Sequence, residues 1–433
     1  MTIRDNRDSV IANIVQQVSA ALVFLIVPVL LGVEQYAQVI VVTTLISFLT
    51  FSDLGVSYVY TRRMPEIYGR ENREEESKWN TTVIRFRIYA ALVFAVVITG
   101  IYWVRYHDAT NALFLMFYPP LATAVAFYSA NNIVQGNFRI VRDVAIVQAL
   151  ARPVMMIPGV VIFGLRGWFA AQLAAILVVF YRADLRAGTR LHWLAKEIFD
   201  RKLIHSVLPE AVSLGLITTL WVQLISFGRT FAAFSYPDQV VAQYGLANAG
   251  YQMVGLVVIA AFIPQTVKVN RMLATNQAGA VDYVFNTVRR TFPVIIGLTV
   301  VALLAAPPLF YIFFQKYHVE HQLLAPLLLS LLYYPVIVSL GVLLSGTGRN
   351  SIYLTLLVLC LALSWIAASW LAAQFGYWAA AIAQFLALTG YTAALLAVVS
   401  ICFRSHTAKM GQVWVYLIVV VMLSGGYLVT LYS

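Results

Sequence analysis

Charge is the property that this sequence has least of. Of its 433 residues, 11% are charged and 61% are apolar or aromatic, whereas soluble domains carry roughly 25% charged residues. Half the usual charge cannot cover the surface of a soluble protein of this length, which excludes a soluble enzyme and a disordered chain. Two cysteines, Cys360 and Cys402, both in apolar runs, exclude a disulfide scaffold. Six histidines without HxxE or HExxH spacing supply no metal motif.

Long apolar runs are what the sequence has instead. They are close to the length of about 20 residues that a helix needs to cross a membrane. We therefore predict an all-α polytopic membrane protein. The predicted membrane segments are 10–32, 37–60, 81–104, 111–135, 141–164, 167–181, 206–230, 241–265, 289–314, 322–345, 350–373, 375–402 and 412–431.

The basic residues lie almost entirely on one side of these segments. Of 29 Lys and Arg residues, 24 fall in the N-terminus and in the loops after the even-numbered segments. Four fall on the opposite side, and Arg152 lies within a segment. The positive-inside rule then predicts a cytoplasmic N-terminus and an external C-terminus. We attribute the net charge of +11 to basic loops facing anionic lipid, and not to a nucleic-acid partner.

The second half of the chain resembles the first at an offset of about 205–212 residues. The matches are FGLRGWFAAQLAAIL (163–177) with FGYWAAAIAQFLAL (375–388), Gly136 and Arg139 with Gly346 and Arg349, TRRM (61–64) with VNRM (269–272), and NTTVIRFR (80–87) with FNTVRR (285–290). Six segments per copy is an even number, so both copies enter the membrane from the same side. This predicts a parallel repeat of two pseudo-symmetric six-helix bundles followed by a thirteenth helix.

The repeat predicts four regions along the chain. They are an N-terminal bundle at 1–181, a cytoplasmic linker at 182–205, a C-terminal bundle at 206–403 and an additional membrane helix at 404–433. The linker alternates basic residues with Leu, Trp, Ile and Phe. Such a pattern suits an amphipathic helix on the inner leaflet, and it also suits a solvated linker with hydrophobic anchors.

The opening of the chain resembles a known family. Asn13 is followed by IVPVLLGVEQYAQ (26–38) and FSDLGVSYVYTRR (51–63), where Pro28, Gly32, Tyr36, Asp53 and Gly55 fit the family pattern. This opening is similar to that of Wzx-type polysaccharide flippases. Their superfamily includes the MATE drug exporters and the lipid II flippase, and it implies a MATE-like, V-shaped pair of bundles. The resemblance covers about residues 10–402.

The resemblance implies a function and a set of partners. The expected task is to flip an undecaprenyl-diphosphate-linked oligosaccharide, an O-antigen or exopolysaccharide unit, from the inner to the outer leaflet by alternating access. The expected location is the bacterial inner membrane, and the expected transport unit is a monomer. A polysaccharide polymerase and a chain-length regulator are candidate partners beside the membrane lipids. No cofactor is expected, and a proton or sodium gradient is the candidate energy source.

Ionisable groups within the membrane are costly and therefore informative, at roughly 2.5–3.5 kcal/mol each at a helix centre. Arg152 lies near the midplane of its segment, and a forked, permanently charged donor suits a diphosphate. Alternatively, Arg152 forms a structural salt bridge with Asp53. For Asp53 we consider three roles: this salt bridge, a cap on the turn before Gly55, and binding of a coupling proton.

Two further charges lie near segment ends. Arg229 ends its segment close to the outer face, where it either snorkels to the interface or contacts the substrate as it leaves. Glu210 lies in the first turn of the predicted segment 206–230, where the helix dipole favours an acid; proton coupling is the alternative.

Neutral polar side chains within the segments can line a cleft that accepts sugars. The candidates are Asn13, Gln17, Asn131, Asn132, Gln223, Asn248 and Gln252. The same residue types also form hydrogen bonds between membrane helices, which is the structural alternative for each of them.

Two other functions remain open. Export of drugs or small molecules on the same fold is the nearer alternative, although cation exporters favour buried acids and the charge near the midplane here is Arg152. A membrane-embedded polymerase or transferase is the other. Such an enzyme needs catalytic groups in sizeable external loops, and the predicted external loops are short, with isolated acids. The sequence therefore predicts a transporter and no enzyme.

Overall fold

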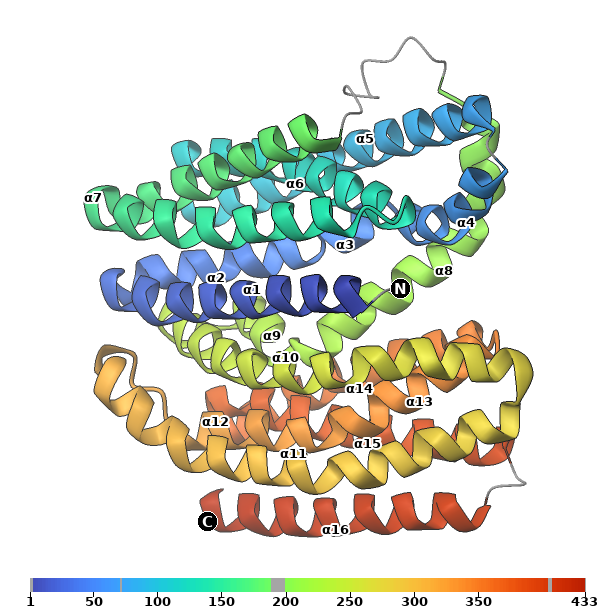
Figure 1. Ribbon diagram of the computed structural model, residues 1–433. Coiled ribbons are helices and arrows are strands. Elements are labelled where there is room, and N and C mark those ends of the chain that lie inside the picture. Colours follow the sequence, from blue (N-terminus) through green and yellow to red (C-terminus); the bar gives the residue numbers. More distant parts are fainter. Residues whose placement is uncertain (1–2, 71, 188–198, 404–406, 433) are drawn as a thin grey trace. The chain divides into compact units, whose positions relative to one another are not determined.

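A computed structural model describes residues 3–70, 72–187, 199–403 and 407–432, and every regular element in these ranges is a helix (Figure 1). Nine stretches of these residues are long and apolar enough to cross a membrane. Two of the nine, at 138–183 and 350–402, each hold two of the predicted segments. The all-α, multi-pass membrane fold predicted from the sequence is therefore confirmed.

The chain forms two compact units, Met1–Thr219 and Leu220–Ser433. The helices of the first unit are α1 (Ile3–Leu30), α2 (Val33–Ser47), α3 (Leu49–Ser52), α4 (Val56–Gly69), α5 (Arg73–Tyr106), α6 (Ala109–Val134) and α7 (Phe138–Ala187). Helix α8 (Arg201–Ile225) contributes residues to both units. Residues 188–198 of the predicted linker lie outside the described residues, so its amphipathic character stays a prediction.

The second unit holds the remaining helices. They are α9 (Phe227–Ser235), α10 (Asp238–Thr275), α11 (Gln277–Phe313), η2 (Gln315–Tyr317), α12 (His321–Leu329), η3 (Ser330–Tyr333), α13 (Tyr334–Gly346), α14 (Asn350–Phe375), η4 (Gly376–Trp378), α15 (Ala379–Cys402) and α16 (Thr407–Tyr432). Helix α16 packs against α11, α12 and α15, and the Tyr432 hydroxyl donates to the Gln322 carbonyl at 2.5 Å. The additional C-terminal helix is thus fastened to the second unit.

The internal repeat is visible in the backbone at three pairs of turns. Gly164 and Gly376 share one unusual conformation, with φ/ψ of 57°/−133° and 54°/−130°. Gly136 and Gly348 both have φ of 75°. These two pairs have the same offset of 212 residues, and they correct the sequence match of Gly136 with Gly346. His107 and His318 form a third pair, with φ of 53° and 48°.

A different membrane segment is interrupted in each of the two units. In the first unit, the second segment is broken between α3 and α4, where Leu54 and Gly55 have positive φ. In the second unit, the first segment is broken between α8 and α9 at Ser226. Interrupted membrane helices need new partners for the freed backbone groups, so these breaks locate polar side chains within the bundles.

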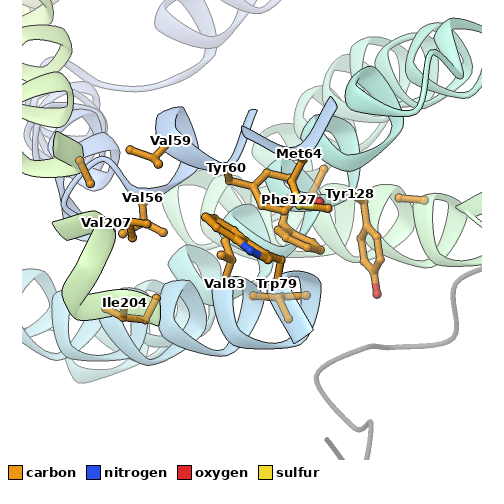
Figure 2. Close-up of a cluster of buried hydrophobic side chains, with 14 of the residues drawn as sticks. Val56, Val59, Tyr60, Met64, Trp79, Val83, Phe127, Tyr128, Ile204 and Val207 are labelled. Atoms are coloured by element: carbon orange, nitrogen blue, oxygen red, sulfur yellow. The ribbon is translucent and has the colours of Figure 1, made fainter. Parts of the chain in front are cut away.

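The first unit also has a well-defined apolar core near the start of α8. Val56, Val59 and Tyr60 of α4 pack with Trp79 and Val83 of α5 and with Phe127 of α6. Figure 2 shows Val207 and Ile204 of α8 in the same cluster, with Val207 next to Val56. This cluster fixes the position of α4 against the beginning of α8.

Candidate polar sites within the two units

A buried ion pair lies at the break between α3 and α4. Asp53 Oδ2 is 2.9 Å from Arg87 Nε, and the two side chains are only 6% and 8% exposed. Asp53 Oδ1 accepts a hydrogen bond from the Gly55 amide at 3.0 Å. Asp53 therefore caps the turn before Gly55, as one of its predicted roles required, and its salt-bridge partner is Arg87 instead of Arg152.

Arg87 is a residue that sequence reasoning missed. The positive-inside count places Arg87 with the basic loop after the second segment, but Arg87 lies well inside α5, which begins at Arg73. The available signal was the arginine pair Arg85 and Arg87 inside the predicted segment 81–104. A buried guanidinium needs a counter-charge, and Asp53 is the buried carboxylate at hand.

Arg152 lies in the first half of α7 and is half-buried. It shares a narrow crevice with Tyr118 of α6 and with Gln148 and Gln172 of α7. Among the described residues, no carboxylate forms an ion pair with it. The rest of the crevice lining is apolar, from Ala175, Ile176 and Val179. Since no carboxylate among the described residues neutralises the guanidinium, it retains the capacity to bind an anion.

Asn131 and Asn132 take part in hydrogen bonds within the first unit. Asn131 Oδ1 lies 2.9 Å from the Tyr60 hydroxyl and 2.8 Å from the Tyr68 hydroxyl. The Asn132 amide donates to the Tyr128 carbonyl at 2.8 Å. Tyr60 also donates to Asn80 at 2.6 Å, so α4, α5 and α6 share one polar network. Both asparagines thus have the interhelical or local bonds of the structural alternative.

Side-chain amides form hydrogen bonds with backbone groups at the helix break in the second unit. Gln384 of α15 accepts from the Gly228 amide at 2.7 Å and donates to the Ile225 carbonyl at 3.0 Å. Gln252 of α10 donates to Ser226 Oγ at 2.8 Å. Gln223 accepts from the Thr230 hydroxyl at 2.9 Å. The predicted cleft residues Gln223 and Gln252 are therefore brought together at this break, along with Gln384, which the sequence did not single out.

Asn248 and Arg229 are buried polar groups of the same unit, with exposed fractions of 1% and 7%. Within the described part of the chain, neither the amide nitrogen nor the oxygen of Asn248 has a hydrogen-bond partner. Burying an amide without partners is unfavourable, so this position carries a cost that the fold itself does not explain. Arg229 lies in α9 and does not snorkel to an exposed position.

Glu210 is placed differently from the sequence prediction. Helix α8 begins at Arg201, so Glu210 is more than two turns into it, and the helix dipole acts only within the first turn. Its carboxylate instead lies 2.8 Å from Arg62 Nη1 and 2.8 Å from Arg63 Nη2 of α4. Two ion pairs with α4 thus take the place of the predicted dipole interaction.

Two predicted residues cannot be assessed. Asn13 and Gln17 lie along α1, but their side chains fall outside those that the structure describes. Their role in a cleft stays a prediction. Among the described residues, no three His, Cys, Asp or Glu side chains are grouped so that they could hold a metal ion.

Comparison with known proteins identifies the fold. No family model matches the sequence, and the comparison with curated proteins gives no match. Solved structures are similar over nearly the whole chain. The fold is that of the MATE and MurJ transporters.

Three solved structures show the extent of this likeness. An inward-facing MATE multidrug-resistance transporter of the MOP superfamily has a TM-score of 0.66 and 14% identity, covering 92% of this chain and 96% of that one. The lipid II flippase MurJ, in an inward closed conformation, has a TM-score of 0.64 and 12% identity, covering 100% and 92%. A mutant of the Vibrio cholerae MATE transporter VcmN has a TM-score of 0.60 and 15% identity, covering 91% and 99%.

Proposed function

We propose that this protein flips a lipid-linked oligosaccharide across the bacterial inner membrane. Its fold is shared with transporters, among them a flippase of lipid II. The observation that carries the proposal is Arg152, a membrane-embedded guanidinium that has no carboxylate partner among the described residues. Such a group attracts an anion, and the diphosphate of a prenyl-linked sugar is an anion that must cross the membrane.

The polar surroundings of Arg152 support the same substrate class. Tyr118, Gln148 and Gln172 line its crevice and can donate to or accept from hydroxyl and phosphate oxygens. In the second unit, the unpartnered amide of Asn248 is a further candidate for a sugar hydroxyl. Within the first unit, Arg152 thus provides a charge for the diphosphate beside neutral hydrogen-bonding groups.

Complementation of a strain that lacks its oligosaccharide flippase tests this proposal. We expect the wild-type protein to restore surface polysaccharide and Arg152→Ala to fail while reaching the membrane at a normal level. Arg166→Ala is the matched control, because Arg166 is exposed at the turn after Gly164. Full activity of Arg152→Ala would remove Arg152 from the site, and failure of the wild-type protein would contradict the function.

A second function has support from the fold comparison, since MATE exporters are prominent among the similar structures. On this alternative, the protein exports drugs or other small molecules. Drug susceptibility in a strain without its main exporters separates the two functions. The flippase proposal predicts unchanged susceptibility, whereas protection that depends on Arg152 would favour export of small anions.

The proposed orientation has the N-terminus in the cytoplasm and the C-terminus outside. Its basis is the distribution of basic residues along the sequence: 24 of 29 lie toward the cytoplasmic side, of which Arg87 is buried within α5 beside Asp53. Reporter fusions after Arg70 and after Tyr432 test it. The first is expected to report a cytoplasmic location and the second an external one. Any other result would contradict the predicted orientation or the predicted number of membrane segments.

A further inference from the structure

Two neighbouring cavities lie along α11 in the second unit, where α16 runs beside α11 (Figure 1). The first has a volume of 470 Å³, and its lining includes Val300, Leu304 and Pro307 of α11, His321 of α12 and Tyr427 of α16. The second has a volume of 620 Å³, and its lining includes Pro307, Tyr311 and Phe314 of α11 with Gln315 and His318 of the following turn. Because Pro307 lines both cavities, they meet there, and we call the two together the α11 groove.

The α11 groove follows a single face of its helix. The α11 residues of its lining recur at spacings of three or four, at positions 300, 304, 307, 311 and 314, which places them on one side of a helix. This stretch is about 21 Å long at a rise of about 1.5 Å per residue. The hydrocarbon of one leaflet is about 15 Å thick, half of the bilayer core. The groove is therefore long enough for a whole acyl chain of one leaflet.

The floor of the groove is apolar and lies between large exposed side chains. Leu304 and Tyr311 are each 72% exposed, and Pro307, with its short ring, lies between them on the same face. The face belongs to a stretch, Gln277–Phe313, that is apolar enough to cross a membrane. Water in such a place would lack polar partners, and empty space would forfeit dispersion contacts. A hydrocarbon chain is thus the occupant that suits the floor.

Polar side chains gather where α11 ends. Gln315 and His318 line the second cavity, and Lys316 is exposed in the same turn. In the first cavity, His321 Nε2 and the Tyr427 hydroxyl form a hydrogen bond with each other. The lining of the groove therefore changes from apolar to polar near the end of the helix, as a phospholipid changes from acyl chain to headgroup.

Charges of both signs lie at this polar end. Lys316 is positive, and Glu320, which immediately precedes α12, is negative. Glu320 Oε2 accepts a hydrogen bond from Trp378 Nε1 at 2.9 Å, which holds the carboxylate in place. A carboxylate has about four acceptor positions, so Glu320 can accept further hydrogen bonds. A headgroup that carries a phosphate and a primary ammonium complements both charges.

We propose that the α11 groove binds one molecule of phosphatidylethanolamine from the leaflet at this end of the second unit. One acyl chain lies along the face from Val300 to Phe314, Lys316 attracts the phosphate, and Glu320 accepts hydrogen bonds from the ammonium. In the proposed orientation this leaflet is the outer one. The lipid site belongs to the second unit, whereas Arg152 belongs to the first, and it does not depend on which substrate the protein transports.

Native mass spectrometry of the purified protein tests the headgroup preference. Phosphatidylethanolamine, phosphatidylcholine and phosphatidylglycerol with identical acyl chains would be titrated separately. We expect one phosphatidylethanolamine to bind about tenfold more tightly than phosphatidylcholine, whose quaternary ammonium has no N–H to donate to a carboxylate. Phosphatidylglycerol, which has no positive charge for Glu320, is also expected to bind more weakly.

Glu320→Gln should remove this preference. The amide oxygen of glutamine can still accept from Trp378, so the variant keeps the local contact while losing the charge. Its affinity for phosphatidylethanolamine is expected to fall to that of phosphatidylcholine, with the affinity for phosphatidylcholine unchanged. Asp238→Asn is the matched control, because Asp238 is an acid at the start of α10 in the same unit.

Filling the floor tests the position of the acyl chain. Val300→Trp occupies the first cavity and is expected to weaken binding of phosphatidylethanolamine about tenfold. Val301→Trp is the control, because Val301 is 61% exposed and points about 100° away around the helix. Thermal unfolding of both variants verifies that they fold equally well.

Three outcomes would overturn the proposal. Equal affinity for all three phospholipids would mean lipid contact without selection, and equal losses from Val300→Trp and Val301→Trp would place the chain elsewhere. Tighter binding of undecaprenyl phosphate than of phosphatidylethanolamine would assign the groove to a prenyl chain instead. These affinities are measured without transport, so a failure of the proposed flippase function would leave them unchanged.

Discussion

The two units share their turns and differ in the chemistry of their interiors. Gly164 and Gly376, and likewise Gly136 and Gly348, have matching backbone conformations at one offset. The first unit nevertheless holds its broken segment with a charge pair, Asp53 and Arg87, whereas the second holds its own with neutral amides such as Gln384. The repeat therefore preserves the path of the chain through its glycines, while the polar groups have diverged.

This difference should make the stability of the two units unequally sensitive to substitution of these polar groups. Loss of either member of a buried ion pair lowers the stability of a protein more than loss of a pair of amide hydrogen bonds does. Of the charged candidates, Asp53, Arg152 and Glu210 lie in the first unit, whereas the buried Arg229 lies in the second. The second unit offers buried neutral groups, including Asn248.

The largest expected effect comes from removing one member of the buried ion pair. Arg87→Met should destabilise the protein by about 3–5 kcal/mol, because it leaves the Asp53 carboxylate buried and unpaired. Thermal unfolding of the purified protein, followed by tryptophan fluorescence, measures this loss. The double variant Asp53→Asn with Arg87→Met should recover most of it, and a double variant as unstable as the single one would contradict the charge-pair interpretation.

A smaller effect is expected from the corresponding change in the second unit. Gln384→Leu leaves the Ile225 carbonyl and the Gly228 amide without partners, at a cost of about 1–3 kcal/mol for each group. The same unfolding measurement applies. Thr392→Val is the control, because the buried Thr392 hydroxyl donates to the Leu388 carbonyl of its own helix. If Gln384→Leu were more damaging than Arg87→Met, the proposed contrast between the units would be reversed.

Substitution of Gly164 or of Gly376 should lower the stability equally if the repeat preserves the backbone conformation at both turns. An L-residue at Gly164 or Gly376 must adopt an unfavourable backbone conformation, which costs about 1–3 kcal/mol. A Cβ atom would meet nothing within 4 Å at Gly376 and only Gln35 at 3.9 Å at Gly164. Alanine at either site is therefore expected to lower the unfolding temperature by a similar amount. Unequal losses would show that packing, instead of backbone conformation, sets the requirement for glycine.

The smallest effect on stability is expected at Asn248. Because its amide has no partner among the described residues, Asn248→Leu should be neutral or stabilise the fold by up to about 1 kcal/mol. If the residue contacts the glycan, the same variant should nevertheless reduce flipping. Wild-type flipping by a stable Asn248→Leu protein would show that the buried amide has no role in the substrate site.

The sequence predicts the helices well because each needs only local information. A run of apolar residues is enough to predict a membrane segment, and the matching FG turns near Gly164 and Gly376 identified the two places where adjacent segments join. The resemblance at the start of the chain also led to the fold that the solved structures show.

The pairing of charged residues could not be predicted in the same way. Which arginine lies opposite Asp53 depends on how α3 and α5 pack, and the basic-loop count included Arg87 among residues exposed to the cytoplasm. Glu210 was likewise interpreted by its position in a helix that begins earlier than predicted. Its pairing with Arg62 and Arg63 is a tertiary contact between residues that are 148 and 147 positions apart in the chain.

A reconstituted flipping assay tests the central claim most directly. Purified protein in liposomes would be supplied with a fluorescent undecaprenyl-diphosphate-linked oligosaccharide, and transfer between leaflets would be followed by quenching of exposed label, with and without proton or sodium gradients. The account predicts transfer by the wild-type protein and none above protein-free liposomes by Arg152→Ala. Absence of wild-type transfer under every gradient, or equal transfer by Arg152→Ala, would contradict it.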